Sequence, residues 1–278
     1  MFLERLACLV NDCNPAAIMD WVIQNRDCRL PEQIICDFMN DLSLTQSNYH
    51  DLHLSGQGGS GFVTPNMTSL TAFYLAKCGY DVAKTGSSGS ISNRGSTEFF
   101  ARMQAKYPSR FIGLSLKYYD IGVTMPWFRY RTILALHPDF NHFMETRLYD
   151  ELHCNDKYTG IRGPEAYYQR RKKQHTIPTL SDNTFYTSFG NVACDEILFA
   201  GTACLNEHVV HTDSIKVIPR GLSAQQIDEI NEKLLLGLDF SSFWYRSLEL
   251  SVSSIIMCHS RWTITRNEAL RRFQAAYG

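Results

Sequence analysis

The chain has 278 residues, of which 44% are hydrophobic, 12% aromatic and 20% charged. This composition is typical of a globular protein and excludes a fibre or a disordered tail. With 27 Lys and Arg against 28 Asp and Glu, the net charge is -1, so no broad basic field points to nucleic acid or an anionic membrane.

No apolar run approaches the roughly 18–20 residues of a membrane span. Glu4 and Arg5 interrupt the first apolar stretch, which makes it a poor signal peptide. The nine Cys form an odd-numbered set without CxxC spacing, unlike a secreted disulfide framework. We therefore expect reduced thiols and a cytoplasmic protein.

Residues 1 to about 46 have helical spacing of apolar side chains. Asn14-Pro15 predicts a helix start, because Asn caps well and Pro suits the first helical position. Leu30-Pro31 opens a further helical pattern that runs through residues 34–39. These stripes predict a small helical unit packed through its apolar faces.

The pattern changes near residue 50. Residues 51–54 predict a short strand, a glycine-rich turn follows at 56–61, and residues 66–78 have helical spacing. A second strand is predicted at 80–84, followed by a small-residue loop at 85–92 and a helix that begins near Ser96. Strand, loop and helix repeated in this order indicate a parallel sheet.

Helical texture returns from about 118 to 150, and residues 151–183 are polar enough to predict a surface loop. That loop contains the basic run 170–173, which is typical of a solvated face. Strands and helices resume from Phe185, and the last helices are predicted at about 223–236 and 240–276.

The two small-residue loops both follow predicted strands and both lead into helices, and in an open parallel sheet ligands bind beyond the carboxyl ends of the strands. Glycine lets backbone N–H groups approach an anion, and helix N-termini near Asn66 and Ser96 favour negative charge. Lys84 adds a cation at a strand end. Further donors are the hydroxyls of Ser60, Thr64, Thr68, Ser69, Ser87 and Ser92. This pattern favours a phosphate site over ordinary turns.

Asp195 and Glu196 form an adjacent carboxylate pair near a predicted strand. Mg²⁺ prefers one or two carboxylates together with substrate phosphates and water. Such a pair is usually surface charge. The phosphate loops predicted in the same chain favour its interpretation as a metal site here.

Together these segments resemble the anthranilate phosphoribosyltransferase family, in the wider class that includes pyrimidine nucleoside phosphorylases. The family's first loop, G-T-G-G-D-G, is similar to G-Q-G-G-S-G at 56–61, and its T-x-N-[IV]-S-T segment to T-P-N-M-T-S at 64–69. Its K-H-G-N-R loop and its S-x-S-G-S-x-D segment are similar to 84–88 and 92–98, and its late D-E-I-x-x-x-G-T to residues 195–202. His137-Pro138 and Arg147 resemble a His-Pro and an acceptor-binding Arg of the family.

The resemblance implies an α/β fold: a small discontinuous helical domain plus a larger α/β domain with a mainly parallel sheet. The helical domain would comprise residues 1–48 and 118–150, and the α/β domain residues 49–117 and 151–278. The ligand would lie between the domains, and the family implies a homodimer.

The implied chemistry is Mg²⁺-dependent transfer of 5-phosphoribose from phosphoribosyl pyrophosphate to a nitrogen, with release of pyrophosphate. By the same resemblance, the diphosphate and ribose would contact Gly56, Gly59, Ser60, Asn66, Thr68 and Ser69. The 5-phosphate side would contact Lys84, Ser92 and Ser96, and the acceptor Arg147. Thr64, Gly86 and Ser87 would also bind the substrate. The metal ligands would be Thr68, Asp195 and Glu196.

Several residues depart from the family pattern. Ser60 replaces the Asp of the first loop, and Thr85-Gly86-Ser87 stands where the family has His-Gly-Asn. The family's central N-x-x-G-P-L stretch has no counterpart. We therefore expect an acceptor other than anthranilate, either another aromatic amine or an N-heterocycle. Two alternatives stay open: a nucleoside phosphorylase that uses inorganic phosphate, and a non-catalytic relative that binds nucleic acid or protein.

Overall fold

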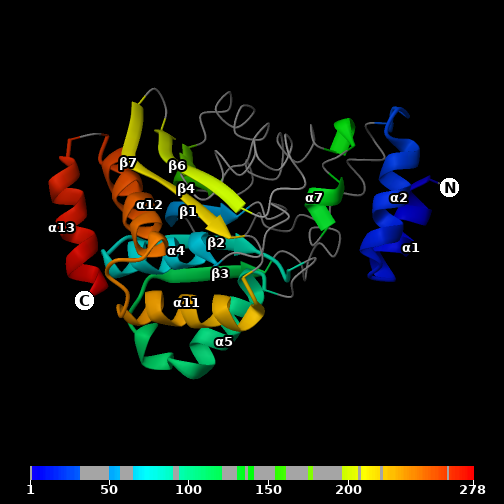
Figure 1. The fold of residues 1–278 in the computed structure, drawn as a ribbon. Coiled ribbons are helices and arrows are strands. Elements are labelled where there is room, and N and C mark those ends of the chain that lie inside the picture. The colour runs from blue at the N-terminus through cyan, green and yellow to red at the C-terminus, as the bar shows by residue number, and fades with distance from the viewer. Residues whose placement is uncertain are drawn as a thin grey trace.

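A computed structural model of the chain describes residues 2–31, 50–56, 65–89, 94–120, 130–134, 137–140, 154–160, 175–177, 196–205, 208–219, 222–261 and 263–278. Its centre is a sheet of strands β1 (His50–Gly56), β2 (Val82–Gly86), β3 (Leu116–Asp120), β4 (Cys154–Gly160) and β5 (His175–Ile177). Within the described residues, these strands are ordered β3-β2-β1-β4-β5 (Figure 1). All neighbouring pairs in this sheet are parallel. The α/β class with a mainly parallel sheet is thus confirmed.

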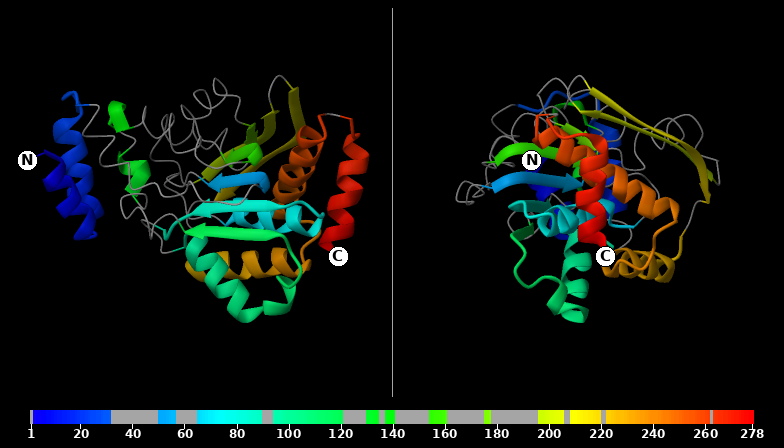
Figure 2. Two further views of the ribbon diagram at one scale, coloured as in Figure 1. Left: turned by 180° about the vertical axis from the view of Figure 1, so that it is seen from behind. Right: turned by 90° about the vertical axis from the view of Figure 1, so that its left-hand side faces the viewer.

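Helix α4 (Met67–Lys77) crosses one face of the sheet and forms the centre of the core. It contacts β1 and β2 on one side and α11 (Ala224–Leu236), α12 (Phe243–His259) and α13 (Arg266–Tyr277) on others (Figure 2). A helix enclosed in this way has no polar face, and every side chain from Ser69 to Ala76 is buried. Gly79, with φ +94°, lies just beyond its end.

Helix α5 (Ser96–Lys106) lies beside α4 and follows β2 in the chain, so β1-α4-β2-α5-β3 is the repeated strand–helix unit expected from the sequence. The short helix η2 (Pro108–Arg110) leads from α5 to β3. Helix α11 begins at a capping box, in which Ser223 and Gln226 bond to each other's backbone N–H, and ends at Gly237 in the left-handed conformation.

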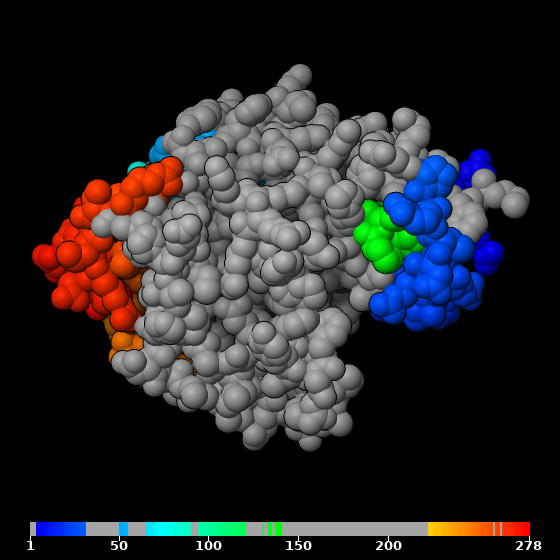
Figure 3. All heavy atoms as spheres, turned by 90° about the horizontal axis from the view of Figure 1, so that it is seen from above, coloured from blue at the N-terminus to red at the C-terminus, as the bar shows by residue number. Residues whose placement is uncertain are grey.

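At the other end of the molecule, α2 (Pro15–Asn25) packs against both α1 (Phe2–Asn11) and α7 (Arg131–Leu134) (Figure 3). Asn14 caps α2 as predicted, through its side chain and the N–H of Ala17. The rings of Trp21 and Phe140 lie 6.4 Å apart. Segments from the start and the middle of the chain therefore meet; the proposed domain boundaries at 48, 117 and 150 stay a prediction.

His137, the histidine of the His-Pro pair, belongs to this contact. Its Nε2 lies 3.1 Å from the carbonyl oxygens of both Asn25 and Cys28, and its Nδ1 accepts from the N–H of Asp139 at 3.2 Å. Because Nδ1 accepts, Nε2 carries the proton and donates to the end of α2. The side chain is 1% exposed and joins the two segments.

The prediction of a surface loop over 151–183 is wrong where β4 and β5 lie. β4 pairs with β1 on one side and β5 on the other, although its sequence, CNDKYTG, contains few apolar residues. Backbone pairing on both sides holds a strand in place whatever its side chains, which is why strand propensity depends so strongly on context.

Strands β6 (Glu196–Leu205) and β7 (His208–Pro219) form a separate antiparallel ladder. Across the described part of the chain, no helix combines the length and hydropathy that a bilayer crossing requires. The helix expected around 34–39 lies outside the described residues.

Candidate functional site

The carboxyl ends of the central strands meet at one edge of the sheet, and glycine occupies three of these ends. Gly56 of β1 is in register with Gly160 of β4, and Gly86 of β2 is in register with Asp120 of β3. Glycine places no side chain at these three strand ends, so that backbone or a ligand can approach them closely. This role was expected from the sequence for Gly56 and Gly86 but not for Gly160.

Lys84 points from β2 toward the helices. It is in register with Leu54 of β1 and is fully buried. Its ammonium Nζ donates to the carbonyl oxygen of Thr85 and, at 3.2 Å, to the hydroxyl of Ser96. A lysine is seldom buried to this extent, which makes a positive charge inside the strand–helix contact the main electrostatic feature of this edge.

The hydroxyl groups of Ser69 and Ser96 lie next to this charge. Ser69, in the first turn of α4, donates to Ser96 Oγ at 3.2 Å, and Ser96 is the first residue of α5. The two helices therefore begin close together. The positive end of each helix dipole favours anions at both helix starts, in addition to Lys84.

The segment after β2 folds tightly against the start of α5. A Cβ atom at Gly86 would lie 2.7 Å from Ser96 Cβ, and one at Gly95 would overlap the backbone of Ser87 to Gly89. The N–H of Gly89 donates to Glu98 Oε2 at 3.2 Å, and Ser87 is buried with its hydroxyl on the carbonyl of Ser88. Glycine is required here by contact, since any side chain would displace the loop.

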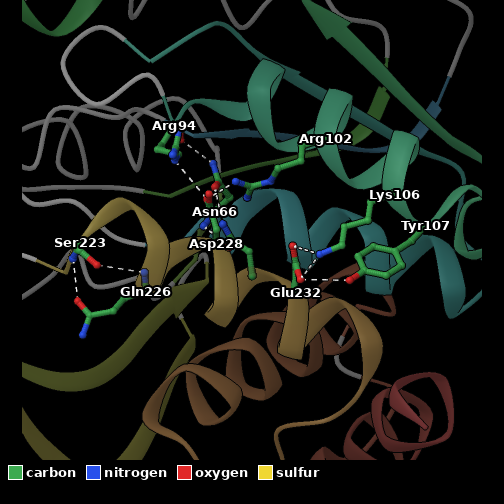
Figure 4. Close-up of polar contacts among 10 residues, drawn as sticks. Asn66, Arg94, Arg102, Lys106, Tyr107, Ser223, Gln226, Asp228 and Glu232 are labelled. Carbon is green, nitrogen blue, oxygen red and sulfur yellow. Dashed lines mark hydrogen bonds and ion pairs between the residues drawn. The ribbon is translucent and has the colours of Figure 1, made fainter.

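Asn66, the residue before α4, is held by two other parts of the chain. Its Nδ2 donates to the carbonyl oxygen of Arg94 at 3.0 Å, and its own N–H donates to Asn231 Oδ1 at 2.9 Å. The Arg94 guanidinium in turn pairs with Asp228 of α11, as does that of Arg102 from α5 (Figure 4).

The structure thus brings together part of the predicted site. Ser69, Lys84 and Ser96 are in direct contact, Gly86 touches Ser96, and Asn66 and Thr68 lie at the same start of α4. Gly56 ends the neighbouring strand. The predicted residues Gly59, Ser60, Thr64, Ser92, Arg147 and Asp195 lie outside the described residues. Glu196 begins β6, and the structure describes its backbone alone.

Other polar residues at this edge were not expected. Thr97 Oγ1 lies 2.8 Å from the hydroxyl of Tyr118 and donates to Asp120 Oδ2 at 2.8 Å, which ties α5 to the end of β3. On the opposite face of the sheet, His53 Nε2 lies 2.8 Å from Thr85 Oγ1, and both side chains are buried. Among the residues whose side chains are described, no group of three or more His, Cys, Asp or Glu could hold a metal ion.

Comparison with known proteins adds one finding. No family model and no curated protein matches the sequence. A solved structure, the crystal structure of anthranilate phosphoribosyltransferase from Thermus thermophilus, matches with a TM-score of 0.52 over 96% of this chain and 87% of that chain. This chain has the fold of that enzyme. The identity is 12%, so the likeness establishes the fold and leaves the activity to the residues of the site.

Proposed function

We propose that the protein transfers 5-phosphoribose from phosphoribosyl pyrophosphate to a nitrogen of an aromatic amine or N-heterocycle other than anthranilate. The new bond joins the acceptor nitrogen to C1 of the ribose, and the C1–O bond to pyrophosphate breaks. Pyrophosphate leaves with the electron pair, and the nitrogen loses a proton. The observation that carries the proposal is the contact of Lys84, Ser69 and Ser96 at the carboxyl edge of this fold.

Charge is the first argument for a phosphorylated substrate. The ammonium of Lys84 and the two helix starts, at Met67 and Ser96, all favour an anion at the same place. In the proposal, the start of α5 and Lys84 hold the 5-phosphate, and the start of α4 with the first glycine loop holds the diphosphate. Fixed donors of this kind stabilise the charge that develops on the leaving group.

Magnesium belongs to the proposal because a departing diphosphate carries charge that a hard cation neutralises when bound. Thr68 stands half-buried in the first turn of α4, where its hydroxyl can reach such an ion. Asp195 and Glu196 would supply the carboxylates. Thr68 is the member of this set whose side chain the structure describes.

The acceptor is proposed to differ from anthranilate because the loop after β2 differs. Thr85 and Ser87 occupy the positions of the family's His and Asn. Thr85 turns to the opposite face of the sheet, where it contacts His53, and Ser87 bonds locally to Ser88. Neither side chain reproduces a His or an Asn that frames a carboxylated aromatic ring.

The test is an acceptor screen that follows the phosphoribosyl group. The purified protein is incubated with phosphoribosyl pyrophosphate, Mg²⁺ and a pool of aromatic amines and N-heterocycles, and products are identified by mass. We expect pyrophosphate release together with one compound that gains a phosphoribosyl group, and loss of both signals in Lys84→Met. Phosphate-dependent cleavage of nucleosides in place of this reaction would replace the proposal with a phosphorylase.

A further inference from the structure

Asn231 connects α11 to the start of α4 by a two-point contact. Its Oδ1 accepts from the N–H of Asn66 at 2.9 Å, and its Nδ2 donates to Asn66 Oδ1 at 3.0 Å. Asn231 is fully buried, and a buried amide is stable only when its donors and acceptors are paired. We call this pair of hydrogen bonds the Asn66–Asn231 clasp.

The same face of α11 also holds the segment that leads into α5. Asp228, one turn before Asn231, pairs with the Nε of Arg94 at 3.2 Å, and the carbonyl of Arg94 accepts from Asn66 Nδ2 (Figure 4). Positions three apart share one face of a helix. A single helix outside the sheet therefore fixes the starts of α4 and α5 relative to each other.

The clasp also bears on the role expected for the Asn66 side chain in the candidate site. Its Oδ1 and one N–H of its Nδ2 are engaged within the protein, by Asn231 and by Arg94. The side chain is thus oriented by its neighbours on both sides. Thr68 and Ser69, two and three residues further along, depend on this orientation because they lie in the turn that Asn66 begins.

We propose that Asn231 is a positioning residue: through Asn66 it sets the start of α4 against the start of α5, so that Ser69, Ser96 and Lys84 meet. The consequence for catalysis rests on the proposed function. The placement of the two helix starts by Asn231 does not. Loss of the clasp lets α4 shift at its first turn. Small displacements of phosphate-binding donors lower the reaction rate strongly, because catalysis depends on alignment.

The experiment compares Asn231→Asp with Glu232→Gln. Asn231→Asp keeps an acceptor for the N–H of Asn66 but places an oxygen opposite Asn66 Oδ1, so one hydrogen bond becomes a repulsion. Glu232 is the next residue on α11 and pairs with Lys106 of α5 and Tyr107, so Glu232→Gln weakens a neighbouring contact of the same helix and leaves the clasp intact. Asn231→Ser serves as the second variant if Asn231→Asp does not fold.

The first readout is hydrogen exchange of the free protein. In Asn231→Asp, we expect amides of residues 66–72 and 94–98 to exchange about tenfold faster, a factor that corresponds to about 1.4 kcal/mol, and those of α13 to be unchanged. Glu232→Gln should leave residues 66–72 as in the wild type. Unchanged exchange at 66–72 in Asn231→Asp and Asn231→Ser, or equal acceleration throughout the chain, would show that the clasp does not hold these helix starts, whatever the protein binds.

The second readout is protection from heat by phosphoribosyl pyrophosphate with Mg²⁺. We expect Asn231→Asp to need at least about tenfold more of this ligand for half-maximal protection, and Glu232→Gln to stay within about twofold of the wild type. Equal requirements in all three proteins would overturn the positioning role. Absence of protection in the wild type would remove the proposed function, and the exchange result would still decide the clasp.

Discussion

Ser69 and Ser96 share a hydrogen bond of 3.2 Å between their hydroxyl oxygens, although they begin different helices and follow different strands. The ammonium of Lys84 lies 3.2 Å from the same Ser96 oxygen. A lysine and two hydroxyls are thereby fixed at the carboxyl edge of the sheet, the part of such folds where ligands bind. The predictions below test what holds this arrangement and what it binds.

Gly86→Ala should damage the site through Ser96. The new Cβ would lie 2.7 Å from Ser96 Cβ and 2.8 Å from its Oγ, so Ser96 or the strand end must move. We expect a loss of about 1–3 kcal/mol in the free energy of unfolding, typical of overpacking, measured by urea denaturation. We also expect weaker heat protection by phosphoribosyl pyrophosphate with Mg²⁺.

Gly79→Ala is the matched control. Gly79 has φ +94°, and no atom lies within 4 Å of its added Cβ, so the cost is backbone strain of about 1–2 kcal/mol away from the site. Both variants should be less stable than the wild type, and ligand protection should suffer in Gly86→Ala alone. Equal ligand protection in the two variants would show that Gly86 does not shape the site.

His137→Ala should destabilise the protein without affecting the phosphate site. The imidazole is buried and donates to the end of α2, so its loss leaves the carbonyls of Asn25 and Cys28 without this donor. We expect a decrease of about 2–3 kcal/mol in the free energy of unfolding, since a buried packing group and a hydrogen bond are lost together. His259→Ala, at a partly exposed position beside Tyr80, should cost less than half as much.

The result for His137→Ala also separates two roles. A variant of normal stability with an altered acceptor preference would contradict the structural role and place His137 in acceptor binding. A less stable variant with an unchanged affinity for phosphoribosyl pyrophosphate is the outcome that the geometry predicts.

Tyr74 should make stability fall at alkaline pH. Burial, with a smaller contribution from Tyr277, raises the pKa of Tyr74 above its ordinary value near 10. The folded state therefore keeps a proton that the unfolded state loses. The contribution is complete below about pH 10 and decreases by up to about 1.4 kcal/mol per pH unit above it.

Tyr74→Phe removes the share of this dependence that belongs to Tyr74, while the raised pKa values of Tyr277, Tyr245 and Cys78 maintain the remainder. Near pH 8 the variant should be about 1–2 kcal/mol less stable, because the hydroxyl donates to the carbonyl of Leu234 at 2.6 Å. By pH 11 the difference should shrink by roughly 1 kcal/mol, since only the wild type has lost the contribution of Tyr74 there. Denaturation curves at pH 8, 9, 10 and 11 test this, and a difference that stays constant over the range would refute the assignment.

Local signals in the sequence predicted much of the fold. Asn14-Pro15 marked the start of α2, and the repeated strand, loop and helix predicted the parallel sheet. The strand β4 was missed because its residues are polar and its stability comes from pairing with β1 and β5. Pairing partners far along the chain leave no local pattern.

The candidate site was likewise predictable where local sequence signals exist, and not where distant segments pack together. Glycine, serine and lysine after two strands were sufficient to predict that Lys84, Ser69 and Ser96 would share one edge. The clasp was not predictable, because Asn66 and Asn231 are 165 residues apart and neither belongs to a motif that joins them. Nor did the sequence indicate that Lys84 would be fully buried. Both features arise from how the helices pack.

The most direct test of the central claim is a melting curve of the wild type and Lys84→Met, each with phosphoribosyl pyrophosphate alone, Mg²⁺ alone and both together. Lys84→Met keeps an unbranched side chain, one atom shorter than lysine, and removes the ammonium group. At a ligand concentration about 100 times its Kd, binding adds about 2.7 kcal/mol to stability, so the wild type should melt several degrees higher with both ligands and unchanged with either one. Lys84→Met should show no such rise. An unshifted wild-type curve with both present, or an equal rise in Lys84→Met, would contradict the account.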